Sequence, residues 1–370
     1  MNIVINAILY HDKPRGVGTY LNNLLKELSI IDDENNYFIY YGSWMENYDF
    51  LKIKKNNFYF IKVSILRNKI IRNLYQLLIF PFAILKYKPD IVHIPDTSPV
   101  LIKTCKTIST IHDIAEFIYP EKYSKLQAFA RRLIVKLQVK FSNKIITVSE
   151  FSRNMIIKKL NVDKNKIITI YNGVNLNRFY HVERFNIGKK FNIKRDEYLL
   201  FVGEIERTKN ISTIIEALNI LRSKNNFKLV ISGKKGNDYN FIMSKIDNYK
   251  LNDRVIITGY VSETDLLELY SNCFAFIFPS LFEGFGIPII EAMACGAPVI
   301  SSNSSSLFEI GGDAVLFFDP NNPNELVEKI NTLLFNNNVR NNLIKNGYKK
   351  IKHFNWQKSA EETLTVYKNI

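Results

Sequence analysis

The sequence has 370 residues, more than one ordinary domain needs and about the length of two. Hydrophobic residues make up 46% and charged residues 23%, a balance that excludes a disordered chain. Lys and Arg number 50 against 35 Asp and Glu, so the formal net charge is +15. That surplus predicts an anionic partner, which is nucleic acid, anionic lipid or a phosphorylated substrate.

Short apolar runs alternate with longer helical patterns along the whole chain. Most runs are continuous in Val, Ile and Phe, which is typical of strands covered on both faces by helices. The expected strands of the first half are 3–6, 37–41, 58–62, 91–93, 107–111 and 144–148. Those of the second half are 198–202, 228–232, 255–258, 275–278, 298–301 and 314–317. Because the strand–helix alternation runs twice, we expect two doubly wound parallel α/β sheets.

A polar, charged stretch at residues 180–195 separates the two series of strands. We therefore predict one Rossmann-like domain over residues 1–184 and a second beginning at residue 185. The positive charge follows the same division. Residues 1–184 hold 28 Lys and Arg against 15 Asp and Glu, whereas residues 185–370 hold 22 against 20. The first domain is thus the one expected to face something acidic.

The cysteines and the apolar segments argue for a cytoplasmic protein. Cys105, Cys273 and Cys295 are far apart and form no CxxC pair, so neither a disulfide framework nor a zinc site is expected. The first five residues are typical of a strand rather than of a signal peptide. Residues 70–85 are shorter than the roughly 20 residues that a membrane span needs, so no transmembrane helix is expected.

Gly16 and Gly18 follow the first expected strand and precede a helix. Glycines at such a turn let a ligand approach the backbone at a helix N-terminus, where anions are favoured. The third glycine of a dinucleotide fingerprint and the lysine of a P-loop are both missing. A tight turn needed only for packing is therefore an equal alternative.

His112 and Asp113 close the strand expected at 107–111, which places two ionisable groups at a carboxyl edge. Ligands bind at such edges in open α/β sheets. The structural alternative, which these two residues alone favour, is a hydrogen-bonded turn histidine followed by an aspartate that caps a helix.

Gly203 ends the first strand of the second half, and Arg207 and Lys209 follow it before a helix. A glycine at a strand end followed by cations is suited to a phosphate group. A solvated basic loop is the alternative.

Two glutamates eight positions apart form the most distinctive pattern of the sequence. Glu283 precedes Gly284, Phe285 and Gly286, and Pro288 opens a helix that contains Glu291. Carboxylates suit sugar and ribose hydroxyls because each oxygen accepts hydrogen bonds without a metal. Glu291 lies in an apolar stretch, where an unpaired carboxylate would be costly.

Taken in order, these motifs resemble glycosyltransferase family 4 over essentially the whole chain. The residues that carry the resemblance are Gly16-Val17-Gly18, His112-Asp113, Gly203 with Lys209-Asn210, Glu283-Gly284-Phe285-Gly286, Glu291-Ala292 and Gly296-Ala297-Pro298-Val299. The resemblance implies the GT-B fold, in which two Rossmann-like domains face each other across a cleft. It also implies domains at 1–184 and 185–354, with a C-terminal helix at 355–370 that crosses back to the first domain.

The resemblance further implies a retaining glycosyltransferase that uses a nucleotide-sugar donor and needs no cofactor or metal. Lys209 would neutralise the donor diphosphate, Glu291 would hold the ribose, and Glu283 would hold the donor sugar. His112 would contact the sugar near the reacting carbon. The catalytic residues are thus expected to be His112, Lys209 and Glu283, and the substrate-binding residues Gly16, Gly18, Asp113, Arg207, Gly284, Phe285, Gly286 and Glu291.

One departure from the family pattern concerns the second phosphate cation. Many members carry Arg directly after the strand-end glycine, whereas this chain has Glu204. The second cation must then come from Arg207 or from elsewhere. The context of His112 and Asp113 is similar to that of mannosyltransferases, so GDP-mannose is the first donor to test. The expected acceptor is a saccharide or an undecaprenyl-type lipid-linked saccharide in surface polysaccharide assembly.

Cations surround the apolar run at 74–85 and interrupt a second one at 133–139. An apolar surface rimmed by cations is typical of docking on an anionic membrane. We therefore expect a peripheral enzyme on the inner face of the cytoplasmic membrane, although the apolar residues would alternatively pack the core of the first domain. Two other functions compete, a nucleotide-sugar epimerase of the same fold and a basic nucleic-acid-binding protein. No nucleic-acid-binding motif is present, so nucleic acid is not an expected partner.

Overall fold

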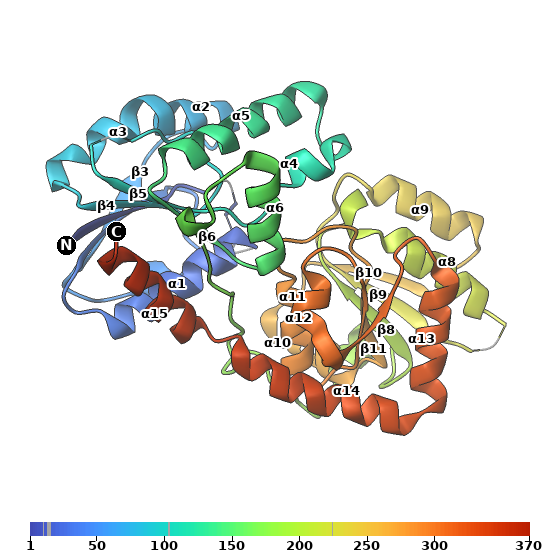
Figure 1. Cartoon of the computed structure of the whole chain (residues 1–370). Coiled ribbons are helices and arrows are strands. Elements are labelled where there is room, and N and C mark those ends of the chain that lie inside the picture. Colours follow the sequence, from blue (N-terminus) through green and yellow to red (C-terminus); the bar gives the residue numbers. More distant parts are fainter. Residues whose placement is uncertain (10, 13–15, 103, 224) are drawn as a thin grey trace. The chain divides into compact units, whose positions relative to one another are not determined.

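The computed structural model describes residues 1–9, 11–12, 16–102, 104–223 and 225–370, and it forms two compact units (Figure 1). Unit 1 comprises Met1–Asn172 and Trp356–Ile370, and unit 2 comprises Gly173–Asn355. The division between the two units falls between residues 172 and 173, earlier in the chain than the boundary expected at residue 184. Residues beyond 172 bond to unit 2, since the amide of Val174 donates to the carbonyl of Phe354 and the amide of Val182 donates to Ser271 Oγ.

Unit 1 is built on a seven-stranded parallel sheet in the order β3-β2-β1-β4-β5-β6-β7. The strands are β1 (Asn2–Ala7), β2 (Asn36–Gly42), β3 (Phe58–Val63), β4 (Ile91–Ile94), β5 (Lys106–Thr110), β6 (Lys144–Thr147) and β7 (Ile167–Thr169). Residues that alternate along β1 point to opposite faces, so Ile3 and Ile5 enter one core and Val4 enters another. Both faces of the sheet are thereby buried, as the continuous apolar runs predict.

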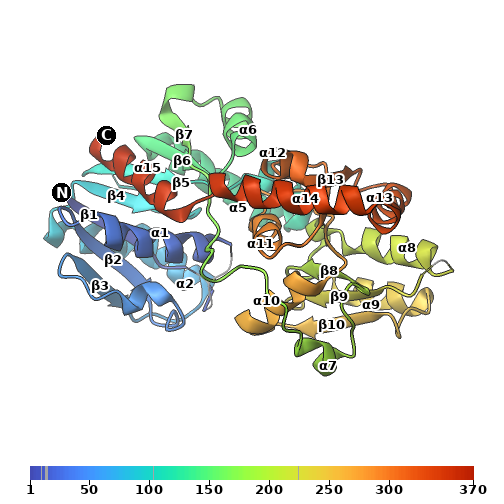
Figure 2. The same cartoon turned by 90° about the horizontal axis from the view of Figure 1, so that it is seen from below.

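Helices cover each face of this sheet (Figures 1 and 2). The helices of unit 1 are α1 (Val17–Ile31), α2 (Lys69–Leu74), α3 (Phe80–Ala83), α4 (Ala115–Ile118), α5 (Lys125–Phe141), α6 (Glu150–Leu160) and α15 (Trp356–Lys368). A π-helical turn (Tyr75–Ile79) joins α2 to α3. Helices α1 and α15 pack together on one face, and α2, α3 and α5 lie over the other.

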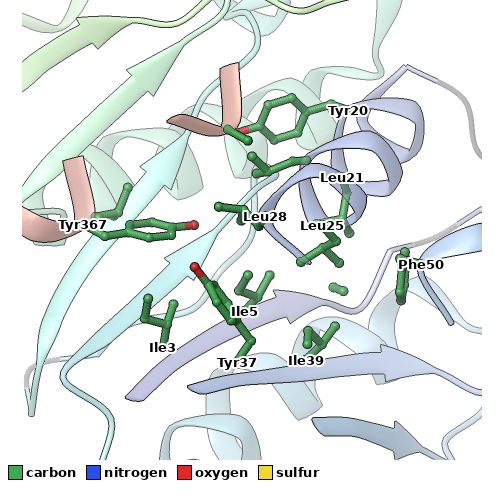
Figure 3. Close-up of a cluster of buried hydrophobic side chains, with 14 of the residues drawn as sticks. Ile3, Ile5, Tyr20, Leu21, Leu25, Leu28, Tyr37, Ile39, Phe50 and Tyr367 are labelled. Carbon is green, nitrogen blue, oxygen red and sulfur yellow. The ribbon is translucent and has the colours of Figure 1, made fainter. Parts of the chain in front are cut away.

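The core under α1 and α15 joins the two sequence segments of unit 1 (Figure 3). Trp356, Ala360 and Tyr367 of α15 are buried there with Tyr20 and Tyr37. Figure 3 shows the hydroxyl groups of Tyr367 and Tyr37 pointing toward each other. Helix α15 is therefore part of the hydrophobic core of unit 1 and not a surface extension.

A chain of hydrogen bonds crosses this core. His93 Nδ1 lies 2.6 Å from Tyr367 Oη, and His93 Nε2 lies 2.8 Å from Thr110 Oγ1. Thr110 Oγ1 in turn lies 3.0 Å from the hydroxyl of Tyr20. Complete burial lowers the pKa of His93 to about 3, so the ring is neutral at pH 7. The network gives each buried polar group a partner, which burial requires.

Unit 2 contains a six-stranded parallel sheet in the order β10-β9-β8-β11-β12-β13. Its strands are β8 (Tyr198–Val202), β9 (Lys228–Ser232), β10 (Val255–Gly259), β11 (Ala275–Phe278), β12 (Val299–Ser302) and β13 (Val315–Phe318). Its helices are α7 (Ile187–Phe191), α8 (Ile211–Leu221), α9 (Tyr239–Asn248), α10 (Glu263–Asn272), α11 (Ile287–Ala294), α12 (Leu307–Gly311), α13 (Pro323–Phe335) and α14 (Asn337–Lys350). The chain leaves β8 toward β10 and returns to β11 on the other side of β8, so the strand order reverses between β8 and β11.

Candidate active site

The loops that follow β8, β11 and β12 meet at the carboxyl edge of the unit 2 sheet, where the strand order reverses. The amide of Leu281, after β11, donates to the carbonyl of Thr208, after β8, at 2.8 Å. The amide of Glu283 donates to Ser305 Oγ, after β12, at 2.9 Å. Open α/β sheets bind ligands outside the carboxyl ends of their strands, at the point where the strand order reverses.

Lys209 and Glu283, two of the predicted catalytic residues, meet at this edge. Lys209 Nζ lies 2.5 Å from Glu283 Oε1 and 5.5 Å from the centroid of the Phe278 ring. Both side chains are mostly shielded from solvent, at 21% and 15% exposure, so their charges are screened less than those of a surface pair. A 3₁₀ turn (Arg207–Lys209) directs Lys209, and Asn210 ends it in the left-handed region at φ 53°.

The turn that carries Glu283 is held by serines from the loop after β12. Ser306 Oγ donates to the carbonyls of Glu283 and Phe285 at 3.0 and 3.1 Å. Together with Ser305 Oγ, it fixes the backbone of residues 283–285. Sequence reasoning missed both serines, and the run of serines at 304–306 was the available signal.

Gly286 is required by the conformation of the same turn. Its φ is 101°, and a Cβ there would lie 2.7 Å from Leu307 Cδ2. Gly286→Ala is therefore expected to lower the free energy of unfolding by about 2 kcal/mol, measured by chemical denaturation. Gly259→Ala is the control, because Gly259 also has a positive φ, 69°, but has open space around it. An equal loss in both variants would contradict a role for the contact with Leu307.

Glu291 lies on α11 and accepts a hydrogen bond of 3.3 Å from the hydroxyl of Tyr270 on α10. Burial raises the pKa of Glu291 to about 7, although the positive charge of Arg178 and the Tyr270 hydrogen bond oppose that rise. Arg178 itself forms an ion pair with Glu263. A carboxyl group whose pKa lies near neutral pH is typical of a functional site. Sequence reasoning missed Tyr270, because nothing in the pattern ties it to α11.

Arg207 and Glu204 lie toward the neighbouring strand β9. The Arg207 side chain is exposed. Burial raises the pKa of Asp238, and the positive charge of Arg207 partly opposes that rise. A Cβ on Gly236 would lie 3.0 Å from Glu204 Cγ. A Cβ on Gly233 would lie 1.8 Å from the carbonyl oxygen of Gly203. The ends of β8 and β9 thus approach so closely that only glycine fits at position 233.

In unit 1, Gly16 precedes α1 with a φ of 46°. Gly18 lies in the first turn of α1, where a Cβ would lie 2.5 Å from the hydroxyl of Tyr48. Packing thus accounts for Gly18, and a ligand role for the Gly16–Gly18 turn remains a prediction. The preceding positions 13–15 lie outside the described residues.

His112 and Asp113 follow β5. The Asp113 carboxylate accepts from the amide of Ala115 at 2.8 Å and so fixes the turn that leads into α4, and a substrate role for Asp113 remains a prediction. His112 Nε2 lies 3.0 Å from the carbonyl of Pro95, and the ring packs edge-on against Tyr20. Burial lowers the pKa of His112 although the charges of Asp96 and Asp113 oppose it. The neutral ring donates from Nε2 to the carbonyl, which leaves Nδ1 as an acceptor.

The structure thus brings Lys209 and Glu283 together in unit 2 and places His112 in unit 1. Among the described residues, no helix combines the length and the apolar character needed to cross a membrane. Within the same residues, His, Cys, Asp and Glu side chains form no group of three or more able to bind a metal ion.

The fold, two parallel α/β sheets in two units, is that of the GT-B class. Residues 14–178 match the model described as glycosyltransferase family 4, and residues 183–350 match that of glycosyl transferases group 1. The chain therefore belongs to the GT-B glycosyltransferases of family 4.

Individual relatives agree with this assignment. The chain is 28% identical to O-antigen chain mannosyltransferase B of Escherichia coli over 95% of this chain and 96% of that protein. It is 26% identical to the N,N'-diacetylbacillosaminyl-diphospho-undecaprenol alpha-1,3-N-acetylgalactosaminyltransferase of Campylobacter jejuni, over 67% of this chain and 66% of that protein. Sucrose-phosphate synthase from Thermosynechococcus elongatus shares the fold, with a TM-score of 0.81 and 21% identity over 100% and 98% of the two chains.

Proposed function

We propose that this glycosyltransferase moves mannose from GDP-mannose to a lipid-linked saccharide in the assembly of a surface polysaccharide. The observation that carries the proposal is the contact of Lys209 with Glu283 at the carboxyl edge between β8 and β11. This edge supplies a cation for a diphosphate and a carboxylate for sugar hydroxyls. The mannosyltransferase relative supports the donor, and the relative named for a diphospho-undecaprenol acceptor supports the acceptor.

In the proposed mechanism the protein stabilises the leaving diphosphate. As the bond from the anomeric carbon to the diphosphate breaks, negative charge develops on the oxygen beside Lys209 Nζ. The acceptor hydroxyl attacks the same face of the sugar, and its proton passes to the departing phosphate oxygen. The anomeric configuration is thereby retained. Glu283 and the backbone of residues 284–286 hold the sugar, and Glu291 holds the ribose.

His112 has a defined part in this proposal. The neutral ring donates from Nε2 to Pro95 and keeps Nδ1 as an acceptor. A sugar hydroxyl is therefore able to donate to Nδ1, which orients the sugar without adding a positive charge near the anomeric carbon.

The raised pKa of Glu291 predicts a pH-dependent affinity for the donor. The ionised carboxylate accepts ribose hydroxyls, and at about pH 6 most of it is protonated because its pKa is about 7. The affinity for GDP-mannose, measured by calorimetry, is expected to rise up to about tenfold from about pH 6 to about pH 8. Glu291→Gln should remove this dependence, and an unchanged pH profile in that variant would contradict the assignment.

The same ionisation affects stability in the opposite direction. The pKa of Glu291 is higher in the folded protein, at about 7, than its ordinary value of 4.5, so folding favours the protonated form. The contribution of Glu291 to the free energy of unfolding is therefore full below about pH 4.5 and declines as the pH rises through 7. Denaturation of wild type and Glu291→Gln across that range measures the difference.

Turnover with a panel of radiolabelled nucleotide sugars tests the function. Transfer to a lipid-linked acceptor that persists in EDTA, with the anomeric configuration retained by NMR of the product, would support the proposal. An inverted product or loss of turnover in EDTA would overturn the proposed mechanism. Interconversion of nucleotide sugars without an acceptor would instead indicate an epimerase. Location at the inner face of the cytoplasmic membrane is part of the proposal, because a lipid-linked acceptor is held there.

A further inference from the structure

The segment from α2 to α3 in unit 1 buries polar side chains and exposes apolar ones, the opposite of what is usual for a helix in water. One side of it is buried and consists of the polar residues Arg72 and Gln76 and the apolar residues Phe80 and Ile84. The opposite side is solvent-exposed and apolar. Ile70, Leu74, Leu78 and Phe82 are 69%, 50%, 58% and 72% exposed. A surface helix normally buries its apolar stripe, so this arrangement requires an explanation.

Buried hydrogen bonds fix the orientation of this segment. Gln76 Oε1 accepts from Asn6 Nδ2 and from Ser98 Oγ, each at 2.7 Å. Rotating the segment to bury Leu74 and Leu78 would break both bonds and leave the buried Asn6 and Ser98 without these partners, a cost that opposes the rotation. The apolar side therefore stays directed outward.

Helix α5 has an exposed apolar stripe of its own in its N-terminal half. Leu126, Phe129 and Leu133 are 78%, 67% and 48% exposed, whereas Val135 and Val139 are buried in a core with Ile145. Phe80 and Ile84 pack on Val4 and Val92 of the same sheet. Both stripes belong to the layer that covers one face of this sheet (Figure 1). We call Ile70, Leu74, Leu78, Phe82, Leu126, Phe129 and Leu133 the apolar face.

The two sequence segments that carry the apolar face hold charges of one sign, although Arg67 pairs with Asp12 and Arg131 with Glu116 from outside those segments. Residues 50–89 contain nine Lys and Arg and no Asp or Glu, and α5 contains five Lys and Arg and no acidic residue. Arg67, Lys69, Lys86 and Lys88 flank the first stripe, and Lys125, Arg131, Arg132, Lys136 and Lys140 accompany the second. Cations beside exposed apolar side chains complement anionic headgroups above an acyl layer.

We propose that the apolar face inserts into the outer part of an anionic lipid bilayer and holds unit 1 on the membrane. A second copy of the chain would bring the same cations against these, so like-charge repulsion disfavours a dimer through this face. No described helix is suited to span a bilayer, which leaves an interfacial position for these segments. The inference rests on the proposed function in one respect, that a lipid-linked acceptor gives the docking its purpose.

Vesicle co-sedimentation of the full-length protein tests the proposal. Vesicles of phosphatidylglycerol with phosphatidylethanolamine are compared with vesicles of phosphatidylcholine, at low and high salt and without substrates. Wild type should bind the anionic vesicles, and binding should weaken as salt rises. The variant Leu74→Gln/Leu78→Gln/Phe82→Gln should bind about a hundredfold less or weaker still, because three apolar side chains leave the acyl layer.

The matched control changes three exposed phenylalanines of unit 2. Phe241, Phe308 and Phe335 are 58%, 62% and 81% exposed, and their replacement by Gln should leave vesicle binding at the wild-type level. Both triple variants change exposed side chains and are expected to fold, which circular dichroism checks. Equal binding by wild type and the apolar-face variant would overturn the proposal. So would failure of wild type to bind, or a dimer in solution that only the apolar-face variant loses.

Transfer to a water-soluble saccharide acceptor separates this proposal from the proposed function. The apolar-face variant should retain that activity at the wild-type level although it no longer binds anionic vesicles. If wild type binds anionic vesicles but transfers no sugar to any acceptor, the proposed function is contradicted and membrane docking by the apolar face is retained. If it transfers sugar but does not bind anionic vesicles, membrane docking by the apolar face is contradicted and the proposed function is retained.

Discussion

Lys209→Ala is expected to lower kcat/KM for sugar transfer by about a thousandfold. The Nζ of Lys209 lies at the switch point of the unit 2 sheet, and in the proposed mechanism the departing diphosphate gains its negative charge beside this group. Removing one preorganised group that stabilises such charge costs roughly 10²- to 10³-fold in rate, and the low exposure of the Lys209 pair places the effect at the upper end. Steady-state kinetics with saturating acceptor measures the loss.

Lys245→Ala is a closely matched control for this variant. Lys245 is also largely shielded, at 17% exposure, and also forms an ion pair within unit 2, with Glu216 on α8. The two alanine variants should therefore lose similar stability, whereas only Lys209→Ala should lose activity. Lys209→Arg keeps the charge and should recover part of the rate, although a guanidinium differs in shape from an ammonium. Equal activity in the Lys209 and Lys245 variants would contradict a catalytic role for Lys209.

Tyr367→Ala is expected to destabilise unit 1 by about 4 kcal/mol, a large effect for a residue in the last turn of α15. Tyr367 is 1% exposed and fills the core between α1 and the sheet, so its truncation leaves a cavity. It also removes the partner of His93 Nδ1, which lies in the same core. A neutral, buried ring nitrogen without a partner adds its own cost.

Tyr367→Phe separates the two contributions. It keeps the ring and removes only the hydroxyl, so the expected loss is about 1–2 kcal/mol, from the hydrogen bond to His93 alone. Because the chain has two units, hydrogen exchange at the amides of β1 and β4 measures the effect on unit 1 directly. Equal protection in the Ala and Phe variants would show that the cavity contributes nothing.

Much of the fold was predictable because strands buried on both faces need continuous apolar runs. Each expected strand overlaps an observed one, and the ends differ by at most one residue. Strand β7 was missed, because Ile167–Thr169 is a three-residue run after a polar turn and too short for a periodic signal. The division between the units precedes the expected boundary because residues 173–184 belong to unit 2 through contacts that no local pattern encodes.

The candidate site was predictable where chemistry depends on residue type and less so where it depends on contact. The sequence singled out Lys209 and Glu283 separately, and only the fold shows that they form an ion pair. Tyr270 and Ser306 act through positions on other elements, which spacing cannot reveal. The cation-rich apolar segments were visible in the sequence. That Arg72 and Gln76 face inward, however, depends on tertiary hydrogen bonds.

The place of α15 in the core of unit 1 has a consequence for biosynthesis. A ribosome completes the seven strands of unit 1 by residue 169 but reaches Trp356 only after all of unit 2. At roughly 5–20 residues per second, the face of the sheet that α15 covers waits on the order of 10 s or longer. Throughout that interval Ile3, Ile5 and Tyr37 lack their final cover, so unit 1 cannot complete its core until all of unit 2 has been synthesised.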